Sequence, residues 1–306
     1  MPNMDNEGVV LAIDIGGTKT GLGIFKPGTG LLADADIPTL PRNGCEDLMK
    51  RAHVRAAALL EQCGESHVRG VGMLSPGPLD LTTGSIVHAP TMGWRDTPLV
   101  KITEDVFQKP VVLQHDTSGA ALGEYSYGCG EPKPKCLVYI TVSTGVGSGI
   151  VIDGKIYNGA FDAAGEVGHL RIEPNGADCP CGGKGCLETI ASGGGISRLA
   201  NEITGRRLSA KQVFELADEG EPSCTQIVAM AGRALGFGVS TLIQLFDPEV
   251  IILGGSVTNG YDQLEPHIYE VLRERVQNYS SRKNVVRKTT LPIGHNSLLG
   301  AAALIT

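Results

Sequence analysis

The sequence is poor in aromatic residues and has no long hydrophobic run without polar interruption. Phe, Trp and Tyr make up 5% of the 306 residues, whereas glycine occurs 42 times. Many glycines suit a protein whose backbone approaches a ligand closely at several turns. The longest apolar stretch, residues 227–246, contains Arg233 and Gln244, which favours a buried helix over a membrane span. Because residues 1–8 are polar and do not resemble a secretory signal, we expect a cytoplasmic protein with no membrane partner.

The sequence also has fewer basic than acidic residues. The chain has 26 Lys and Arg against 33 Asp and Glu, a formal net charge of −7. Nucleic-acid-binding domains commonly carry a basic stripe, and because the sequence has none we expect no nucleic-acid partner. A neutral small molecule fits this balance as a substrate. The charge of a nucleotide would then be met locally by Mg²⁺ and backbone amides.

Two series of strands and helices follow one another along the chain. The first opens with three strands joined by tight turns, which predicts an antiparallel meander. Its predicted strands are residues 9–15, 20–25, 31–37, 68–74 and 111–114, and its predicted helices are residues 45–63, 96–108 (capped by Asp96) and 117–127. The second series has predicted strands at 136–143 and 250–253, a glycine-rich turn at 145–149 and a hairpin around Asp153-Gly154. The repetition predicts two α/β lobes connected by residues 128–135.

Three glycine-rich turns follow predicted strands. Their sequences are Asp14-Ile-Gly-Gly-Thr-Lys19, Ser143-Thr-Gly-Val-Gly-Ser-Gly149 and Leu253-Gly-Gly-Ser256. Glycines let backbone N–H groups approach phosphate oxygens, and Asp14 could hold Mg²⁺ through water. Each motif alone is more often only a turn, and neither the Walker nor the dinucleotide spacing occurs. The three motifs together indicate a nucleotide-phosphate site.

Asp116 stands where a predicted strand ends and a helix begins. Catalytic carboxylates of α/β folds often lie at such a junction, where a carboxylate could take the proton of an attacking hydroxyl. The alternative is a helix N-cap, a role that aspartate commonly fills. The residues around Asp116 leave both roles open.

Four soft metal ligands occur within 18 residues: His169, Cys179, Cys181 and Cys186. Three thiolates and one imidazole predict a closed, tetrahedral, structural zinc site. A redox-active Cys-x-Cys pair is the alternative, but it gives Cys186 and His169 no role. The remaining cysteines lack ligand spacing and are expected to be ordinary thiols.

Two glutamates accompany these ligands. Glu166 precedes His169 by three residues, and Glu188 follows Cys186 by two. Exposed glutamates are most often only solvated, but a bound metal would fix the orientation of side chains next to its ligands. Together with Asp116, such carboxylates could accept several hydrogen bonds from a polyhydroxylated substrate.

The combined pattern resembles the ROK family (repressor, ORF, kinase) of the actin-like ATPase superfamily. The resemblance runs from Ile13 to Ala302 and is most specific at 164–169 and 179–188. It implies an α/β, two-lobed actin-like ATPase fold with ribonuclease H-like lobes and an inter-lobe active-site cleft. We expect an N-terminal lobe of residues 8–127, joined by a C-terminal helix at 296–306, and a C-terminal lobe of residues 128–295.

The resemblance also implies roles for individual residues. Asp116 is the expected catalytic base, with ATP, Mg²⁺ and a structural Zn²⁺ as cofactors. His169 would bind both zinc and sugar. The expected sugar contacts are Gly77, Thr91, His115, Asp116, Glu166, His169 and Glu188. The expected contacts to the nucleotide and its Mg²⁺ are Asp14, Gly16, Gly17, Thr18, Lys19, Thr144, Gly145, Gly147, Gly254 and Gly255.

Two positions depart from the family pattern. The family commonly has Asn before the catalytic Asp, where this chain has His115, and a Pro-Asn pair where this chain has Pro90-Thr91. An imidazole offers a sugar hydroxyl one donor and one acceptor, in a different shape from an amide. Either these residues select another sugar, or His115 turns away and Thr91 makes no contact.

The implied activity is transfer of the γ-phosphoryl group of ATP to a hexose, at the 6-hydroxyl as in glucokinases, by a homodimer. The alternatives are an N-acetylmannosamine, N-acetylglucosamine or other hexose kinase, and a sugar sensor without turnover. The family also includes sugar-responsive repressors. Only 13 residues precede Asp14, too few for a helix-turn-helix, so we do not expect that function.

Overall fold

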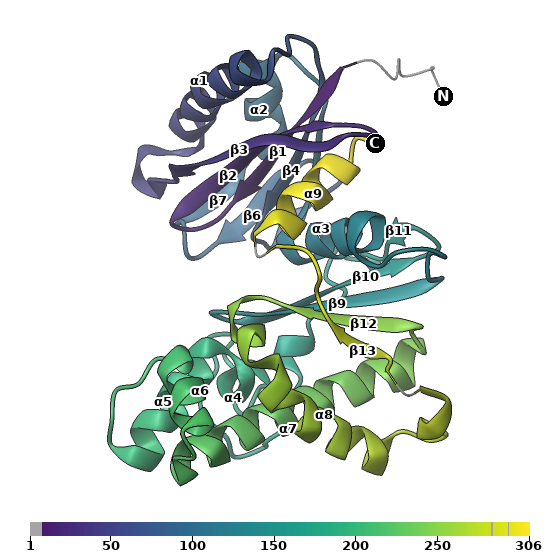
Figure 1. The fold of residues 1–306 in the computed structure, drawn as a ribbon. Coiled ribbons are helices and arrows are strands. Elements are labelled where there is room, and N and C mark those ends of the chain that lie inside the picture. Colours follow the sequence, from purple (N-terminus) through teal and green to yellow (C-terminus); the bar gives the residue numbers. More distant parts are fainter. Residues whose placement is uncertain (1–7, 283, 293) are drawn as a thin grey trace. The chain divides into compact units, whose positions relative to one another are not determined.

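The computed structural model of the protein describes residues 8–282, 284–292 and 294–306. The chain forms two compact units, each built on its own sheet (Figure 1). The first consists of the chain up to Gly130 with Ile156–Ala163 and Gly294–Thr306, and the second of Glu131–Lys155 and Ala164–Ile293. The sequence-based division assigned residues 156–163 to the C-terminal lobe, whereas in the structure they lie with the first unit.

The first unit has a five-stranded sheet in the order β3-β2-β1-β4-β8. Its strands are β1 (Val9–Ile15), β2 (Lys19–Lys26), β3 (Gly30–Pro38), β4 (Val68–Ser75) and β8 (Val111–His115). The first three pair antiparallel, which confirms the predicted meander. β4 and β8 extend the sheet parallel to β1, so the carboxyl ends of these three strands lie at one edge.

Helices cover both faces of this sheet (Figure 1). α1 (Cys45–Cys63), with the predicted bounds, packs with α2 (Leu99–Phe107) over one apolar core. On the other face lie α3 (Asp116–Gly123), which continues into a wider turn at Glu124–Gly128, and α9 (His295–Ala303). Leu298 of α9 joins a second core with residues of β1, β2 and β4.

The prediction that Asp96 caps the second helix is wrong. Asp96 has φ of 44° and lies in β7 (Trp94–Thr97), part of a small antiparallel sheet with β5 (Leu79–Asp80) and β6 (Ser85–Ala89). The helix begins after Pro98, its N-cap residue. The physical reason is that proline disfavours helical conformation in the residue before it, so the chain stays extended through Thr97.

The second five-stranded sheet repeats the strand order of the first: β11-β10-β9-β12-β13. Its strands are β9 (Cys136–Val142), β10 (Val146–Ile152), β11 (Lys155–Ile156), β12 (Val250–Gly254) and β13 (Val286–Lys288). β9 and β10 are antiparallel, while β12 runs parallel to β9 and to β13. The glycine turn predicted at 145–149 is shorter than expected, because pairing of Val146 with Val142 already places Gly147 and Gly149 in β10.

Helices of the second unit pack together around an apolar core. They are α4 (Glu188–Ala191), α5 (Gly193–Thr204), α6 (Ala210–Asp218), α7 (Pro222–Phe246) and α8 (Tyr261–Arg275). Within the described part of the chain, α7 alone is long and apolar enough to cross a membrane, and 67% of its most apolar window is buried inside the protein. A Cβ at Gly232 would lie 2.7 Å from the Cβ of His267. α7 and α8 therefore approach closely, as core helices do.

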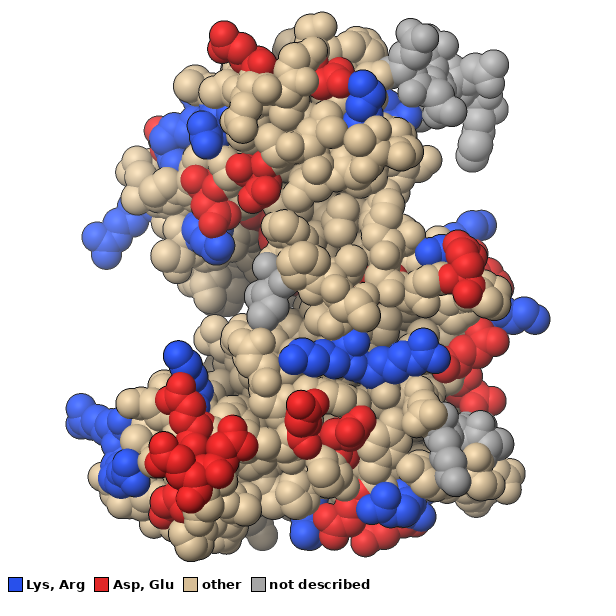
Figure 2. Space-filling view, in the orientation of Figure 1, with Lys and Arg blue, Asp and Glu red and all other residues tan. Residues whose placement is uncertain are grey.

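Charged side chains of both signs are interspersed on the face drawn in Figure 2. Several exposed pairs lie one helical turn apart, such as Lys211 and Glu215 of α6, whose nitrogen and oxygen are 3.6 Å apart. Each such pair contributes little to stability, because water screens it.

Candidate functional site

Two carboxylates lie at the carboxyl edge of the first sheet. Asp14 is the penultimate residue of β1, and Asp116 follows β8 directly as the first residue of α3. The register places Asp14 beside Leu74 of β4, and His115 beside the next residue of that strand. The structure thus brings together the predicted Mg²⁺ residue and the predicted base.

The electrostatics of Asp14 reflect this proximity. Loss of hydration on burial and the nearby charge of Asp116 raise the pKa of Asp14 from 3.8 to about 7. Two carboxylates in this arrangement repel each other, and a divalent cation would relieve the repulsion. Oxygen ligands of this kind are those that Mg²⁺ prefers, so the residues present fit the ion.

The structure does not support the N-cap alternative for Asp116. The N-cap residue of α3 is His115, and its side chain makes no capping hydrogen bond. The Oδ1 atom of Asp116 accepts a hydrogen bond from the backbone N–H of Thr117 at 2.7 Å. Asp116 therefore lies inside the first turn of the helix.

The first glycine turn is held tightly between β1 and β2. The N–H of Gly16 donates to the carbonyl of Lys19 at 3.0 Å, and Thr39 Oγ1 donates to the carbonyl of Gly16 at 2.6 Å. A Cβ at residue 16 would lie 2.8 Å from the Lys19 carbonyl oxygen, so this turn requires glycine. Thr18 and Lys19 at its tip are exposed.

Two of the predicted sugar contacts, Thr91 and His115, lie in the first unit. Thr91 lies against the first glycine turn, where a Cβ on Gly17 would be 3.6 Å from its Oγ1 atom. His115 packs against Gly77, where a Cβ would be 2.5 Å from the Cε1 atom of the imidazole. Nε2 of His115 is buried and has no hydrogen-bond partner among the described residues.

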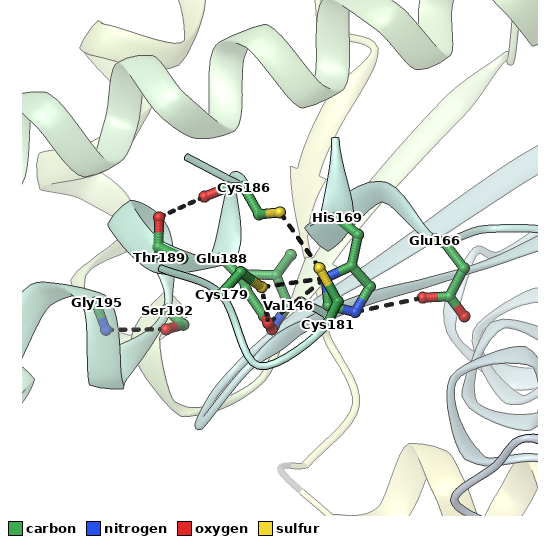
Figure 3. Close-up of polar contacts among 10 residues, drawn as sticks. All are labelled: Val146, Glu166, His169, Cys179, Cys181, Cys186, Glu188, Thr189, Ser192 and Gly195. Carbon is green, nitrogen blue, oxygen red and sulfur yellow. Dashed lines mark hydrogen bonds and ion pairs between the residues drawn. The ribbon is translucent and has the colours of Figure 1, made fainter. Parts of the chain in front are cut away.

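The predicted zinc ligands form a cluster in the second unit (Figure 3). Ligand atoms of His169, Cys179, Cys181 and Cys186 all lie within 4.8 Å of one another. Cys181 Sγ and Cys186 Sγ are 3.7 Å apart, and Cys179 Sγ is 3.6 Å from His169 Nδ1. Zinc–sulfur bonds of about 2.3 Å would place two ligands of a tetrahedron about 3.8 Å apart. The spacing and the donor set therefore fit zinc.

Backbone contacts fold the knuckle that carries these ligands. The N–H of Cys179 donates to the carbonyl of Gly183 at 2.8 Å, and a Cβ on Gly185 would lie 1.5 Å from the carbonyl oxygen of Glu173. Burial raises the pKa of the Cys179 and Cys186 thiols, whereas a backbone hydrogen bond from Gly183 lowers that of Cys181. A bound cation would displace the thiol protons.

Both predicted glutamates lie next to His169 (Figure 3). Glu188 Oε1 is 3.6 Å from His169 Nδ1 and accepts a hydrogen bond from Cys179 Sγ at 3.3 Å. Glu166 Oε2 is 3.8 Å from Nε2 on the other side of the ring, and the Glu166 side chain is exposed. Glu188 also reaches the second glycine turn, because its Oε2 accepts from the Val146 N–H at 3.4 Å.

A cavity of 670 Å³ opens beside the second glycine turn, entirely within the second unit. Its lining includes Ser143, Thr144, Gly193, Gly194, Phe214 and Ser256. Of the predicted nucleotide contacts, Thr144 lines it, and Gly145 and Gly255 adjoin lining residues in the chain. Gly147 lies in β10, and Gly254 is the last residue of β12. A Cβ on Gly255, whose φ is 89°, would lie 2.4 Å from the Val142 carbonyl oxygen, so this turn requires glycine.

The glycine-rich motifs did not indicate the lining residues of α5 and α6. The run Ser192-Gly-Gly-Gly195 is a sequence feature that could have indicated part of this lining. Ser192 caps α5 by accepting a hydrogen bond from the Gly195 N–H at 3.0 Å. Glycines in the first turn leave helix N–H groups accessible to an anionic ligand.

Comparison with known proteins identifies relatives along the whole chain. The model of the ROK family matches residues 10–306. A glucokinase of Halalkalibacterium halodurans is 35% identical over 274 residues, which cover 83% of this chain and 82% of that protein. An N-acetylmannosamine kinase of Yersinia pestis is 33% identical over 257 residues, covering 83% and 85% of the two chains.

Solved structures agree with this assignment. A ROK family glucokinase from Streptomyces griseus, in complex with glucose and AMPPNP, is 30% identical and has a TM-score of 0.81, with 97% of this chain and 99% of that chain covered. The predicted α/β, actin-like two-lobed fold is thereby confirmed. Since the family model spans nearly every residue and relatives exceed 30% identity over most of both chains, this protein belongs to the ROK family.

Proposed function

We propose that the protein is an ATP-dependent hexose kinase that transfers the γ-phosphoryl group to a sugar hydroxyl, the 6-hydroxyl. The observation that carries the proposal is the pair Asp14 and Asp116 at one sheet edge, beside a glycine turn. The relatives named glucokinase and the Streptomyces griseus complex with glucose and AMPPNP support the same reaction.

Asp116 acts as the general base in this proposal. Its carboxylate accepts the proton of the sugar hydroxyl while the hydroxyl oxygen bonds to the γ-phosphorus. The bond from that phosphorus to the bridging oxygen breaks, and ADP leaves. The glycine turn at 16–17 and the exposed Thr18 and Lys19 bind phosphate oxygens. Bound Mg²⁺ supplies positive charge that stabilises the phosphate oxygens.

The second unit carries its own candidate ligand contacts. The 670 Å³ cavity is large enough for the adenosine part of a nucleotide, and Thr144 in its lining is a candidate contact to phosphate oxygens. Zinc held by His169 and the three cysteines would orient the imidazole, so that its Nε2 and the Glu166 carboxylate can bind sugar hydroxyls together with Glu188. We further propose that the protein acts as a homodimer in the cytoplasm.

Two observations bear on which sugar is the substrate. The Yersinia pestis relative named N-acetylmannosamine kinase is nearly as similar as the glucokinase relative. His115 and Thr91 also stand where the family commonly has asparagines. We therefore propose an N-acetylhexosamine as the second candidate substrate, and another hexose as the third.

The test measures ADP release from ATP and Mg²⁺ in the presence of each sugar of a panel. The panel includes glucose, mannose, allose, glucosamine, N-acetylglucosamine and N-acetylmannosamine. Asp116→Asn should lose about 10²–10⁴-fold in turnover on the preferred sugar, because a general base contributes that much. Its binding of the sugar, measured calorimetrically, should persist.

The matched control is Asp105→Asn, which changes an exposed carboxylate of α2 that pairs with Lys101. This variant should turn over at the wild-type rate. Equal rates for wild type and Asp116→Asn would refute the role of Asp116. Absence of turnover on every sugar, with the protein folded and sugar bound, would favour a sensor without catalysis.

A further inference from the structure

Thr39 follows β3 directly and lies against the first glycine turn. The residue is fully buried, with 0% of its surface exposed. Its Oγ1 atom lies 2.6 Å from the carbonyl oxygen of Gly16 and 3.0 Å from Thr20 Oγ1. A carbonyl oxygen can only accept, so the Thr39 hydroxyl donates to Gly16, and the Thr20 hydroxyl must donate to Thr39. The direction of each hydrogen bond in this buried group is therefore determined.

The backbone of Thr39 makes a second contact with the same turn. Its N–H donates to the carbonyl oxygen of Thr18 at 2.9 Å. Two carbonyls of the turn, those of Gly16 and Thr18, are thus held toward Thr39. Because a trans peptide directs its N–H opposite to its C=O, the N–H of Gly17 points away from Thr39. The turn therefore presents an N–H group, and not the Gly16 carbonyl oxygen, on the side opposite to Thr39.

Arg51 of α1 holds the segment that carries Thr39. Its guanidinium donates to the carbonyl oxygens of Pro38 and Thr39, the second from Nη2 at 2.8 Å. The carboxylate of Asp47, one turn earlier in the same helix, lies 2.8 Å from Arg51 Nε and fixes the side chain. The position of Thr39 is therefore set by contacts from α1 as well as from β2.

We propose that Thr39 is a positioning residue for nucleotide binding: it turns carbonyls of the first glycine turn inward, so that N–H groups on the opposite side meet phosphate oxygens, and Arg51 holds it in place. The proposal rests on the phosphate contacts proposed above for that turn. A carbonyl oxygen directed at a phosphate would repel its negative charge, whereas an N–H group binds it. Without the Thr39 hydroxyl, the Gly16 carbonyl would lose its partner, and the flexible glycine peptide would be free to rotate.

A binding experiment tests this role without requiring turnover. The dissociation constant of AMPPNP with Mg²⁺ is measured calorimetrically for wild type, Thr39→Val and Thr39→Ser. Valine keeps the shape of threonine but lacks the hydroxyl, so Thr39→Val should weaken binding by about tenfold. Serine keeps the hydroxyl, and Thr39→Ser should bind as wild type does. In turnover assays, the KM for Mg²⁺–ATP should rise in Thr39→Val while the KM for sugar stays unchanged.

Thr103→Val is the matched control. Thr103 of α2 is also fully buried in the first unit, and its Oγ1 donates to the carbonyl oxygen of Leu99 in the same helix at 2.7 Å. Both valine variants lose one buried hydrogen bond to a carbonyl, so both should unfold at a lower temperature. Only Thr39→Val should also bind the nucleotide more weakly, which separates positioning from general stability.

Arg51→Met supplies a second test, because Arg51 is partly exposed and its replacement leaves Thr39 itself intact. This variant should also bind the nucleotide more weakly. Lys50→Met removes a neighbouring exposed positive charge and should leave the affinity unchanged. If Thr39→Val does not fold, wild-type affinity in a folded Arg51→Met overturns the proposal. Weaker binding in Arg51→Met but not in Lys50→Met upholds it.

The outcomes distinguish this role from the kinase proposal. Wild-type affinity in a folded Thr39→Val, or an equal loss in Thr39→Ser or Thr103→Val, overturns the positioning role even if sugar is phosphorylated. Weaker nucleotide binding in Thr39→Val, restored by serine, upholds it even if no sugar in the panel is turned over. A wild-type protein that binds no Mg²⁺–AMPPNP overturns both.

Discussion

His169 presents its two ring nitrogens to two different partners. Nδ1 lies 3.6 Å from Cys179 Sγ, and Nε2 lies 3.8 Å from Glu166 Oε2 (Figure 3). A metal bound at Nδ1 would leave the proton on Nε2, where it points toward a carboxylate. Metal binding and the hydrogen-bonding capacity of this part of the molecule are therefore coupled through one ring.

We expect the purified protein to contain about one zinc ion per chain, because its four ligands are complete. Cys181→Ser should lose the metal, unfold at a lower temperature and show a raised KM for sugar, since His169 loses its anchor. Elemental analysis and thermal unfolding measure both effects. Cys63→Ser, at the end of α1 and outside the cluster, is the control and should retain zinc. Zinc at wild-type levels in Cys181→Ser would contradict the assigned ligand set.

The raised pKa of Asp14 predicts that the stability of the protein depends on pH. Its pKa is raised to about 7 in the folded protein, so the folded state binds a proton more tightly than the unfolded chain. This contribution to stability is complete at low pH and is lost as pH rises toward and through about 7. In metal-free buffer, Asp14→Asn should therefore unfold at a higher temperature than wild type at pH 8, and the difference should shrink at pH 5.

The same variant should bind Mg²⁺–AMPPNP poorly at every pH, because the carboxylate is absent. Calorimetry at pH 8 measures this loss. Asp34→Asn, on the edge strand β3, is a control that removes an exposed carboxylate. An Asp14→Asn protein that is less stable than wild type at pH 8 would show that the desolvation of Asp14 is small.

Gly77 and His115 should behave as a coupled pair. In Gly77→Ala, the added methyl would lie 2.5 Å from His115 Cε1, so the imidazole must move. We expect a lower unfolding temperature and an altered KM for sugar. In the double variant Gly77→Ala/His115→Asn, the smaller side chain removes that contact and should restore part of the stability. Strictly additive effects in this double-mutant cycle would contradict the coupling.

Gly300 should tolerate no side chain. A methyl group there would meet the carbonyl oxygen of Gly119 at 1.9 Å, and neither backbone can rotate away as a side chain could. Gly300→Ala should lower the free energy of unfolding by about 2 kcal/mol or more, as overpacking does. Chemical denaturation measures the change. Ala303→Ser, which adds one atom at a half-buried position of the same helix, should have little effect.

Local patterns in the sequence predicted much of the fold. The meander of β1–β3 and the bounds of α1 followed from glycine turns and apolar spacing, because both are local properties. The ligand cluster was also predictable, since its four members lie close together in the chain. The prediction that Asp96 caps the second helix was wrong, because Pro98, two residues later, determines where that helix starts.

Contacts between distant segments were not predictable in the same way. Leu298 reaches Gly21 and Gly23 of β2 only because α9 packs on the first sheet and on α3, and no spacing in the sequence signals that packing. The cavity beside Thr144 likewise depends on α5 and α6. The buried Nε2 of His115 depends on how the ring packs against Gly77.

The shared strand order of the two sheets has an evolutionary consequence. A gene encoding one half, copied and fused in tandem, would produce a chain with this repeated topology. The hairpin β1–β2 in one half then corresponds to the hairpin β9–β10 in the other. After such a duplication, the first copy would have come to carry Asp14 and Asp116, while the second acquired the cysteine knuckle.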